Sequence, residues 1–405
     1  MNSIKLILTF VVAFFLSVLG FSQEVTNGKF GKGIYNVIAA DSSWSMKFGA
    51  RFQTLYIGEW DVDDKGSFTN GSSNFLVRRA RLKFDGFAYS PKLEYKLELG
   101  LSNRDMSGAS QYTSNSPRYI FDALLKWNFY KNFVLWMGQT KLPGNRERVV
   151  SSANLQFVDR SMLNSAFNID RDMGIQLRHH FKIGSTFLVR EIVAFSQGEG
   201  RNITSGNLGG YQYTYRVEFL PFGAFSKKGD YMGGDLMREE KVKLSIAGSY
   251  DMNDNAVKTK SNLGSYMVND MGGLYETDIH TLFIDAMLKY KGFSLMAEYA
   301  QREADYPEAI NDDGTLTGDI VNVGKGINLQ MGYLFKSNWE LSGRFTQIDY
   351  IKEITGNDVT SQYTLGLSKY LSGHKLKVQS DISYATSDNF TTGGLMSRLQ
   401  IDIHF

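Results

Sequence analysis

The sequence of 405 residues contains no cysteine and only five prolines. Without cysteine, the chain has no disulfide framework, no thiol nucleophile, no thiolate-bound metal and no site for a lipoprotein anchor. An excess of charge of one sign is also lacking, because 44 Lys and Arg stand against 42 Asp and Glu, a net charge of +2. This balance argues against a dedicated nucleic-acid-binding protein, which carries a strong basic excess.

Long apolar runs are scarce as well, and the mean hydropathy is −0.26. A helical-bundle membrane protein needs several apolar runs of about 20 residues, so that class is excluded. The chain does have 40 Gly, 22 Tyr and 28 Phe. Many glycines and aromatics with few prolines indicate an all-β chain that is rich in turns.

One apolar run stands out, at the N-terminus. Residues 1–5 carry one positive charge, residues 6–19 are apolar apart from a Thr and a Ser, and Gly20 and Ser22 are small. These features are typical of a cleaved secretory signal peptide over residues 1–22, with an uncleaved anchor as the alternative. We therefore predict export through the inner membrane and a mature domain of residues 23–405.

The rest of the chain alternates apolar and polar residues with a period of two. In residues 94–99, for example, Tyr, Leu and Leu alternate with Glu, Lys and Glu. Sixteen such segments of about ten residues occur, the length that a tilted strand needs to cross a bilayer. They begin near residues 44, 74, 94, 119, 133, 173, 187, 211, 242, 278, 293, 326, 339, 361, 375 and 395. The pattern predicts an all-β fold, a transmembrane antiparallel barrel of 16 strands.

The connections between these segments alternate in length, which predicts short periplasmic turns and long extracellular loops. The long connections are residues 60–73, 103–118, 142–172, 197–210, 253–277, 303–325, 350–360 and 385–394. Residues 221–241 are the exception, a long connection where a short turn is due. A secreted β-sandwich or solenoid is the alternative, but aromatic residues near the strand ends favour girdles at two lipid interfaces.

The C-terminal segment is amphipathic and ends in Phe405. A terminal aromatic on the last strand resembles the signal that barrel-assembly machinery recognises in Gram-negative outer membranes; an ordinary edge strand is the alternative. We therefore predict the cell outer membrane as the location, with its lipid and lipopolysaccharide as surroundings.

The polar faces of the strands predict what lines the lumen. Assigned by parity, they carry seventeen bases and eleven acids, an excess that favours anions. Arg79, Arg81 and Lys83 fall on one face at roughly 6.6 Å spacing, with Lys47 and Arg51 on the neighbouring strand. Such a column can pass an anion from site to site.

Two alternatives remain open for this wall. The bases of the column pair with nearby acids such as Asp85, Glu94 and Glu98, or the whole lumen is a mixed, unselective one. On the same parity Arg78 faces the lipid.

Residues 138–177 resemble the signature of the phosphate-selective porin O and P family. The matching elements are Gly138-Gln-Thr-Lys141, Arg146-Glu-Arg148, Phe157-Val-Asp-Arg-Ser161 and residues 166–176, AFNIDRDMGIQ. Further similarity lies at Arg78 to Leu82 and at Trp339 to Arg344, so the resemblance covers the mature chain apart from its loops. The style of the chain is similar to members from the Bacteroidota.

The resemblance implies a 16-stranded porin, usually trimeric, whose third loop folds inward as a constriction loop, here residues 142–172. It implies Arg and Lys side chains that bind phosphate or polyphosphate. Carried over to this sequence, the residues in or near the constriction are Lys141, Arg146, Arg148, Arg160 and Arg171.

We therefore expect a passive diffusion channel with anion preference. Uptake of phosphate or polyphosphate is the more specific form of this hypothesis. A non-selective general porin and a non-conducting barrel that acts as an adhesin or binding protein are the alternatives. None of the five His lies in a metal-binding spacing. We expect no enzyme, no cofactor, no metal and no nucleic-acid partner. The role of residues 221–241 is left open by the sequence.

Overall fold

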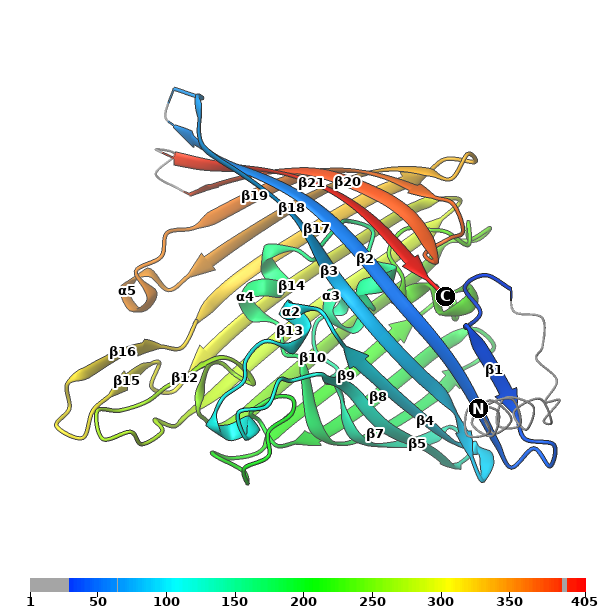
Figure 1. Cartoon of the computed structure of the whole chain (residues 1–405), viewed down its shortest axis with the longest axis horizontal. Coiled ribbons are helices and arrows are strands. Elements are labelled where there is room, and N and C mark those ends of the chain that lie inside the picture. Colours follow the sequence, from blue (N-terminus) through cyan, green and yellow to red (C-terminus); the bar gives the residue numbers. More distant parts are fainter. Residues whose placement is uncertain (1–28, 64, 388–391) are drawn as a thin grey trace, which may run out of the picture.

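The computed structural model describes residues 29–63, 65–387 and 392–405, so the predicted signal peptide lies outside the described residues. The chain forms a closed antiparallel barrel of sixteen strands (Figure 1). In order around the wall these are β2 (Trp44–Asp63), β3 (Phe68–Ala88), β4 (Ser90–Gly100), β5 (Ile120–Tyr130), β6 (Phe133–Lys141), β7 (Arg171–Ile183), β8 (Phe187–Ser196), β9 (Gln212–Leu220), β10 (Lys243–Ala256), β13 (Thr277–Tyr290), β14 (Phe293–Ala304), β17 (Gly324–Leu334), β18 (Trp339–Tyr350), β19 (Thr360–Tyr370), β20 (Leu376–Ser387) and β21 (Thr392–His404). Strands β2 and β21 close the barrel, in a register that pairs Thr54 with Ile401. The predicted fold is confirmed.

The two faces of each strand meet different surroundings. In β17, Ile327, Leu329 and Met331 point outward and are exposed, whereas Asn328 and Gln330 point inward and are buried. An apolar outer face suits lipid, and closure pairs the backbone groups that lipid cannot satisfy.

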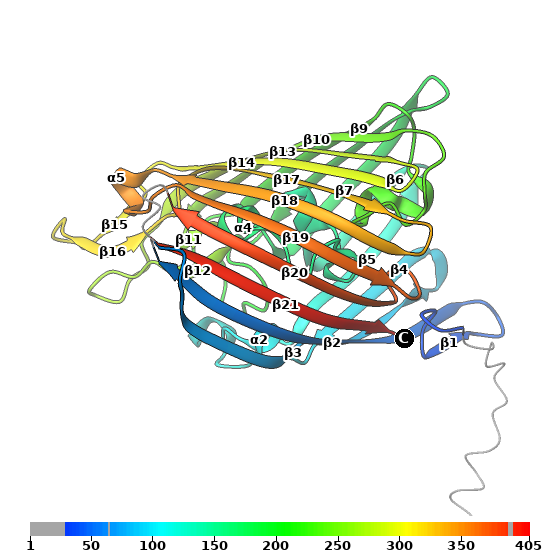
Figure 2. The same cartoon turned by 90° about the horizontal axis from the view of Figure 1, so that it is seen from above.

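The two ends of the barrel differ in the length of the connections between strands. The C-terminus and β1 (Tyr35–Ile38) lie at one end, and the hairpins β11–β12 (Lys258–Lys260, Leu263–Tyr266) and β15–β16 (Glu308–Ile310, Leu316–Ile320) lie at the other, with α5 (Lys352–Thr355) (Figure 2). Short turns make the first end periplasmic and the second extracellular. Residues 60–73 are not the predicted loop, because β2 continues to Asp63 and β3 begins at Phe68. Among the described residues, no helix is long and apolar enough to cross a membrane.

A β-bulge overturns the predicted direction of one side chain. Gln53 pairs with Arg79 while the next residue, Thr54, pairs with Val77, so Arg78 is an extra residue in β3. The extra residue shifts the alternation by one position. Arg78 therefore faces the lumen beside Arg79, and its side chain is only 6% exposed.

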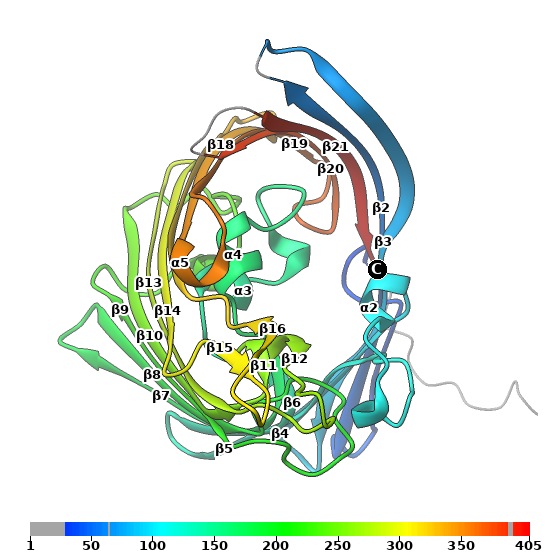
Figure 3. The same cartoon turned by 90° about the vertical axis from the view of Figure 1, so that its left-hand side faces the viewer.

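Two segments fold into the barrel. The first, residues 142–170 between β6 and β7, is called the inner loop below, and it contains α3 (Arg146–Val149), η3 (Ser152–Asn154) and α4 (Met162–Phe167). Looking along the barrel, α3 and α4 lie within the ring of strands, nearer one side of it (Figure 3). The second, residues 221–241 between β9 and β10, is called the periplasmic segment, and it contains η4 (Ser226–Tyr231). Two short helices, α2 (Asn103–Met106) and η2 (Gln111–Thr113), lie in an extracellular loop.

Candidate functional site

An apolar contact fixes the inner loop to the barrel wall. Leu163, Phe167 and Ile169 of the loop pack against Phe283 on β13 and Ala300 on β14, and all five are buried. Each large side chain buried in this way contributes roughly 1.5–3 kcal/mol. These apolar side chains would be unfavourable in a water-filled lumen, so the cluster holds the inner loop against β13 and β14.

Glycines in the wall allow the loop to come close. A Cβ at Gly326 on β17 would lie 2.8 Å from Leu163, and one at Gly366 on β19 would lie 2.9 Å from Phe157. Larger residues at these two positions would force the loop away from the strands.

Buried ion pairs complete the attachment of the loop. Arg146 is fully buried and donates through Nε to Asp285 on β13 at 2.8 Å and through Nη2 to Ser245 on β10 at 2.9 Å. Arg302 on β14 donates to the carbonyl oxygens of Ala166 at 3.1 Å and Phe167 at 2.7 Å. The loop is therefore held along a wide arc of the wall and narrows the lumen from one side.

The side of the lumen that the inner loop leaves free contains a cavity of about 460 Å³. Its lining is strongly basic, with twelve bases and five acids among the described residues. The bases are Arg78, Arg79, Arg81, Lys96, Arg104, Lys141, Arg148, Arg160, Arg171, Arg178, Arg201 and Arg216, and the acids are Glu98, Asp105, Asp122, Asp159 and Asp170. The excess of seven sits in a chain whose net charge is only +2, so positive charge is concentrated in this cavity.

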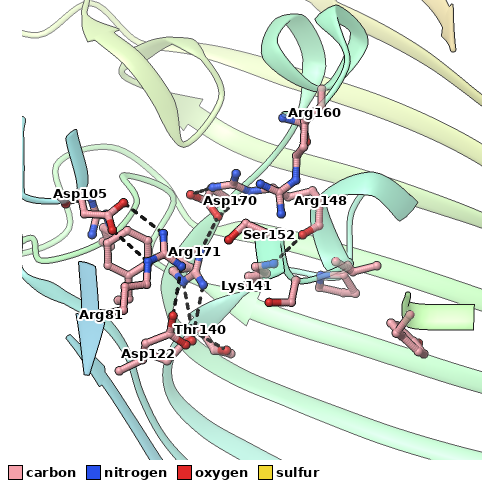
Figure 4. Close-up of a pocket in the computed structure, with 18 of the residues that line it drawn as sticks. Arg81, Asp105, Asp122, Thr140, Lys141, Arg148, Ser152, Arg160, Asp170 and Arg171 are labelled. Carbon is pink, nitrogen blue, oxygen red and sulfur yellow. Dashed lines mark hydrogen bonds and ion pairs between the residues drawn. The ribbon is translucent and has the colours of Figure 1, made fainter. Parts of the chain in front are cut away.

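Seven of the cavity bases form ion pairs. Arg81 bonds Asp105 at 2.9 Å and Glu98 at 3.0 Å, which is the pairing foreseen for Glu98. Arg148 and Arg171 both approach Asp170, and Arg171 also donates to Asp122 at 3.1 Å (Figure 4).

The other five bases have no carboxylate within 4.0 Å in the described part of the chain. They are Arg104, Lys141, Arg160, Arg178 and Arg201. Lys141 Nζ donates to the carbonyl oxygens of Arg148 at 2.7 Å and Val150 at 3.1 Å. Arg201 likewise donates to the carbonyl oxygens of Arg118 and Asp105. Carbonyl oxygens orient these groups but carry no full negative charge, so an anion does not have to displace a carboxylate in order to bind them.

Three of the arginines surround one aromatic ring. The guanidinium carbons of Arg81, Arg201 and Arg171 lie 4.0, 4.1 and 4.7 Å from the centroid of Phe121 on β5. Guanidinium groups are attracted to a ring face by about 0.5–2 kcal/mol each. Phe121 therefore helps to hold three like charges near one another, in addition to the carboxylates that pair with Arg81 and Arg171.

The pKa values of two loop arginines are lowered in these crowded surroundings. Burial, together with the neighbouring Arg118 and Arg171, lowers the pKa of Arg201 to about 9. Burial likewise lowers the pKa of Arg160 to about 10. Both stay protonated at neutral pH, and a bound anion would relieve the repulsion.

The structure brings six of the ten predicted site residues to this cavity. They are Arg79, Arg81, Lys141, Arg148, Arg160 and Arg171. The other four do not border it. Lys83 pairs with Asp85 at 2.8 Å, Arg51 pairs with Asp402 at 2.8 Å, Lys47 lies nearer the periplasmic end of β2, and Arg146 anchors the inner loop.

Sequence reasoning missed other members of the site. Arg104 and Arg201 come from extracellular loops, 103–118 and 197–210, and nothing in their local sequence shows that these loops turn inward. Phe121 was also missed, because a single aromatic in a strand does not reveal three arginines gathered from β3, β7 and a loop.

A closed sixteen-stranded barrel with an inner loop and a basic lumen defines a porin-type barrel of the outer membrane. A family model described as phosphate-selective porin O and P matches residues 52–393, and the chain belongs to that family. An uncharacterized protein of Aquifex aeolicus is 25% identical over 342 residues, which cover 78% of this chain and 77% of the relative.

Solved structures show the same fold at low identity. The anion-selective porin from Comamonas acidovorans has a TM-score of 0.52 and 14% identity, with coverage of 89% of this chain and 100% of that one. The trimer form of in-vitro folded OmpT from Vibrio cholerae has a TM-score of 0.51 and 11% identity, with coverage of 90% and 100%.

Proposed function

We propose that this porin is a passive channel that prefers anions. Among anions, we propose that phosphate-class oxyanions are its preferred substrates. The observation that carries the proposal is the set of five cavity bases without a carboxylate partner within 4.0 Å among the described residues. An anion that enters gains their attraction, and the predominance of arginine suits the oxygens of phosphate or carboxylate. The family description and the anion selectivity of the Comamonas porin support the same direction.

The test is the single-channel current of the purified protein in planar bilayers under a KCl gradient. We expect a reversal potential that favours chloride, and block of the chloride current by added phosphate. Conductance without chloride preference would make the chain a general porin. A barrel that conducts no current would point to an adhesin or binding protein instead.

We also propose that the barrel assembles as a trimer, as the OmpT neighbour does in its trimer form. Phe405, exposed at the end of β21, would serve the barrel-assembly machinery after cleavage behind residue 22. Cross-linking of outer-membrane extracts should give a threefold mass. N-terminal sequencing should begin at Gln23, and Phe405→Ala should lower the amount of assembled barrel.

A further inference from the structure

The periplasmic segment is fastened inside the barrel at many points. Lys289 on β13 donates to the carbonyl oxygens of Gly229 at 2.8 Å and Met232 at 2.9 Å. Asp235 accepts from the backbone N–H of Gly292 at 2.8 Å. A surface turn needs no such buried ammonium, so this long connection is built into the wall on the β13–β14 side.

The segment also supports the inner loop. The N–H of Gly233 donates to the carbonyl oxygen of Asn154 at 2.6 Å, and Arg146 donates to the carbonyl oxygen of Asp230 at 3.3 Å. The inner loop and the periplasmic segment therefore form one body that fills the same side of the lumen.

One residue of the segment reaches the cavity. Tyr231 lines it, and its hydroxyl donates to Glu218 on β9 at 2.9 Å. Its ring lies 5.5 Å from the guanidinium carbon of Arg146 and 5.7 Å from that of Arg190. Two guanidinium groups and one carboxylate therefore lie around the Tyr231 side chain.

The cavity lining that contains Tyr231 also has an aromatic and basic group on β6 and β7. Trp136 on β6 lines the cavity. The centroid of its ring lies 3.7 Å from the guanidinium carbon of Arg178 and 5.0 Å from Nζ of Lys126. Trp136 is three residues above the periplasmic end of β6, and Lys141 at the other end of β6 lines the cavity too. Five residues along a strand span roughly 16 Å, so the cavity extends about that far along β6, and Tyr231 belongs to the same lining.

We infer that the periplasmic segment forms the floor of the anion cavity and that Tyr231, in the same lining as Trp136 and Arg178, sets the size of the exit into the periplasm. This inference rests on the proposed channel function. An anion leaves past two aromatic edges and the cations that they carry, and the bulk of Tyr231 limits what passes.

The experiment compares Tyr231→Ala with Tyr231→Phe and with Tyr306→Ala, which removes an exposed tyrosine from an extracellular loop. Single-channel conductance and permeation of organic anions of increasing size are measured. Tyr231→Ala should raise conductance by about 1.5-fold and admit larger anions, because a pore's narrowest ring controls passage. Tyr306→Ala should match the wild type, and Tyr231→Phe, which keeps the ring but loses the hydrogen bond to Glu218, should lie closer to the wild type than Tyr231→Ala does. Equal conductance and equal size limits in Tyr231→Ala would overturn the inference.

A second variant tests the same inference by a change that is made only after the barrel has assembled. The chain has no cysteine, so Tyr231→Cys carries a unique thiol that a bulky thiol reagent can modify after assembly. Modification should reduce the current of this variant, and an unchanged current would overturn the inference. The chloride preference of the wild type reports separately on the proposed function, since it does not depend on Tyr231.

Discussion

Asp159 of the inner loop accepts two hydrogen bonds from Arg78, from Nε at 3.1 Å and from Nη2 at 2.5 Å. It accepts a third from Arg79 at 3.1 Å. Two consecutive strand residues reach one carboxylate only because the bulge turns both of them inward. The bulge in β3 thus ties the tip of the inner loop to the wall opposite its apolar anchor.

Asp159→Asn should loosen this tie. Hydrogen bonds to charged groups contribute about 1.5–3 kcal/mol each, so the loop should lose about 2 kcal/mol of docking energy. We expect a noisier open-channel current and faster proteolysis within residues 142–170. Asp305→Asn, at an exposed extracellular acid, removes the same charge and should change neither. A quiet, protease-resistant Asp159→Asn channel would show that the tie is dispensable.

The same contact predicts how the channel responds to acid. Burial would raise the pKa of Asp159, but Arg79 and Arg78 outweigh burial and hold that pKa well below its ordinary value. A carboxyl with a depressed folded pKa contributes stability that is fully present above about pH 4 and is lost only as pH falls further. The difference in conductance and noise between the wild type and Asp159→Asn should therefore be the same from pH 8 to about pH 4.5. A difference that disappears between pH 7 and pH 5 would contradict the prediction.

The strands were predictable because the bilayer imposes a strict rule on each of them. One face meets lipid and the other meets the lumen, so alternation such as that of residues 94–99 fixes the number and the parity of the strands. The bulge at Arg78 escaped this reasoning, since one inserted residue leaves no mark in the composition.

The site was predictable only where charge and strand parity coincide. Arg79 and Arg81 were found because both follow the alternation of β3, and Lys141 because the family signature contains it. The anchoring contacts of Arg146 could not be predicted, since its three buried partners come from β9, β10 and β13 and no local pattern shows them. Contacts between distant segments decide which arginines are neutralised and which remain open to an anion.

Reversing the charge of a base without a carboxylate partner should weaken anion preference. The variants are Lys141→Glu and Arg201→Glu. Reversing one unit charge about 10 Å from an ion's path changes its energy by about 0.8 kcal/mol in water, or about fourfold in permeability ratio. The reversal potential in a KCl gradient measures this ratio. Lys325→Glu, at an exposed lysine outside the cavity, should leave it unchanged, and an equal ratio in all three variants would remove these residues from the pathway.

Phe121→Leu tests the aromatic support without altering any charge. The three guanidinium groups should lose about 0.5–1 kcal/mol of positioning each and spread apart. We expect phosphate to block the chloride current about threefold less strongly, with little change in conductance. Phe75→Leu, at a phenylalanine that is 82% exposed on the outer face, is the matched control. Equal block by phosphate in both variants would mean that Phe121 only fills space.

Arg146→Met should release the inner loop from the wall. Removing one partner of a buried ion pair typically costs about 3–5 kcal/mol, because Asp285 is left with less compensation. We expect a larger and noisier conductance, weaker chloride preference and a lower melting temperature in detergent. Arg146→Lys keeps the charge but not the planar group that reaches both Asp285 and Ser245, so it should fall between Arg146→Met and the wild type. Wild-type conductance and stability in Arg146→Met would show that the apolar cluster around Phe167 holds the loop by itself.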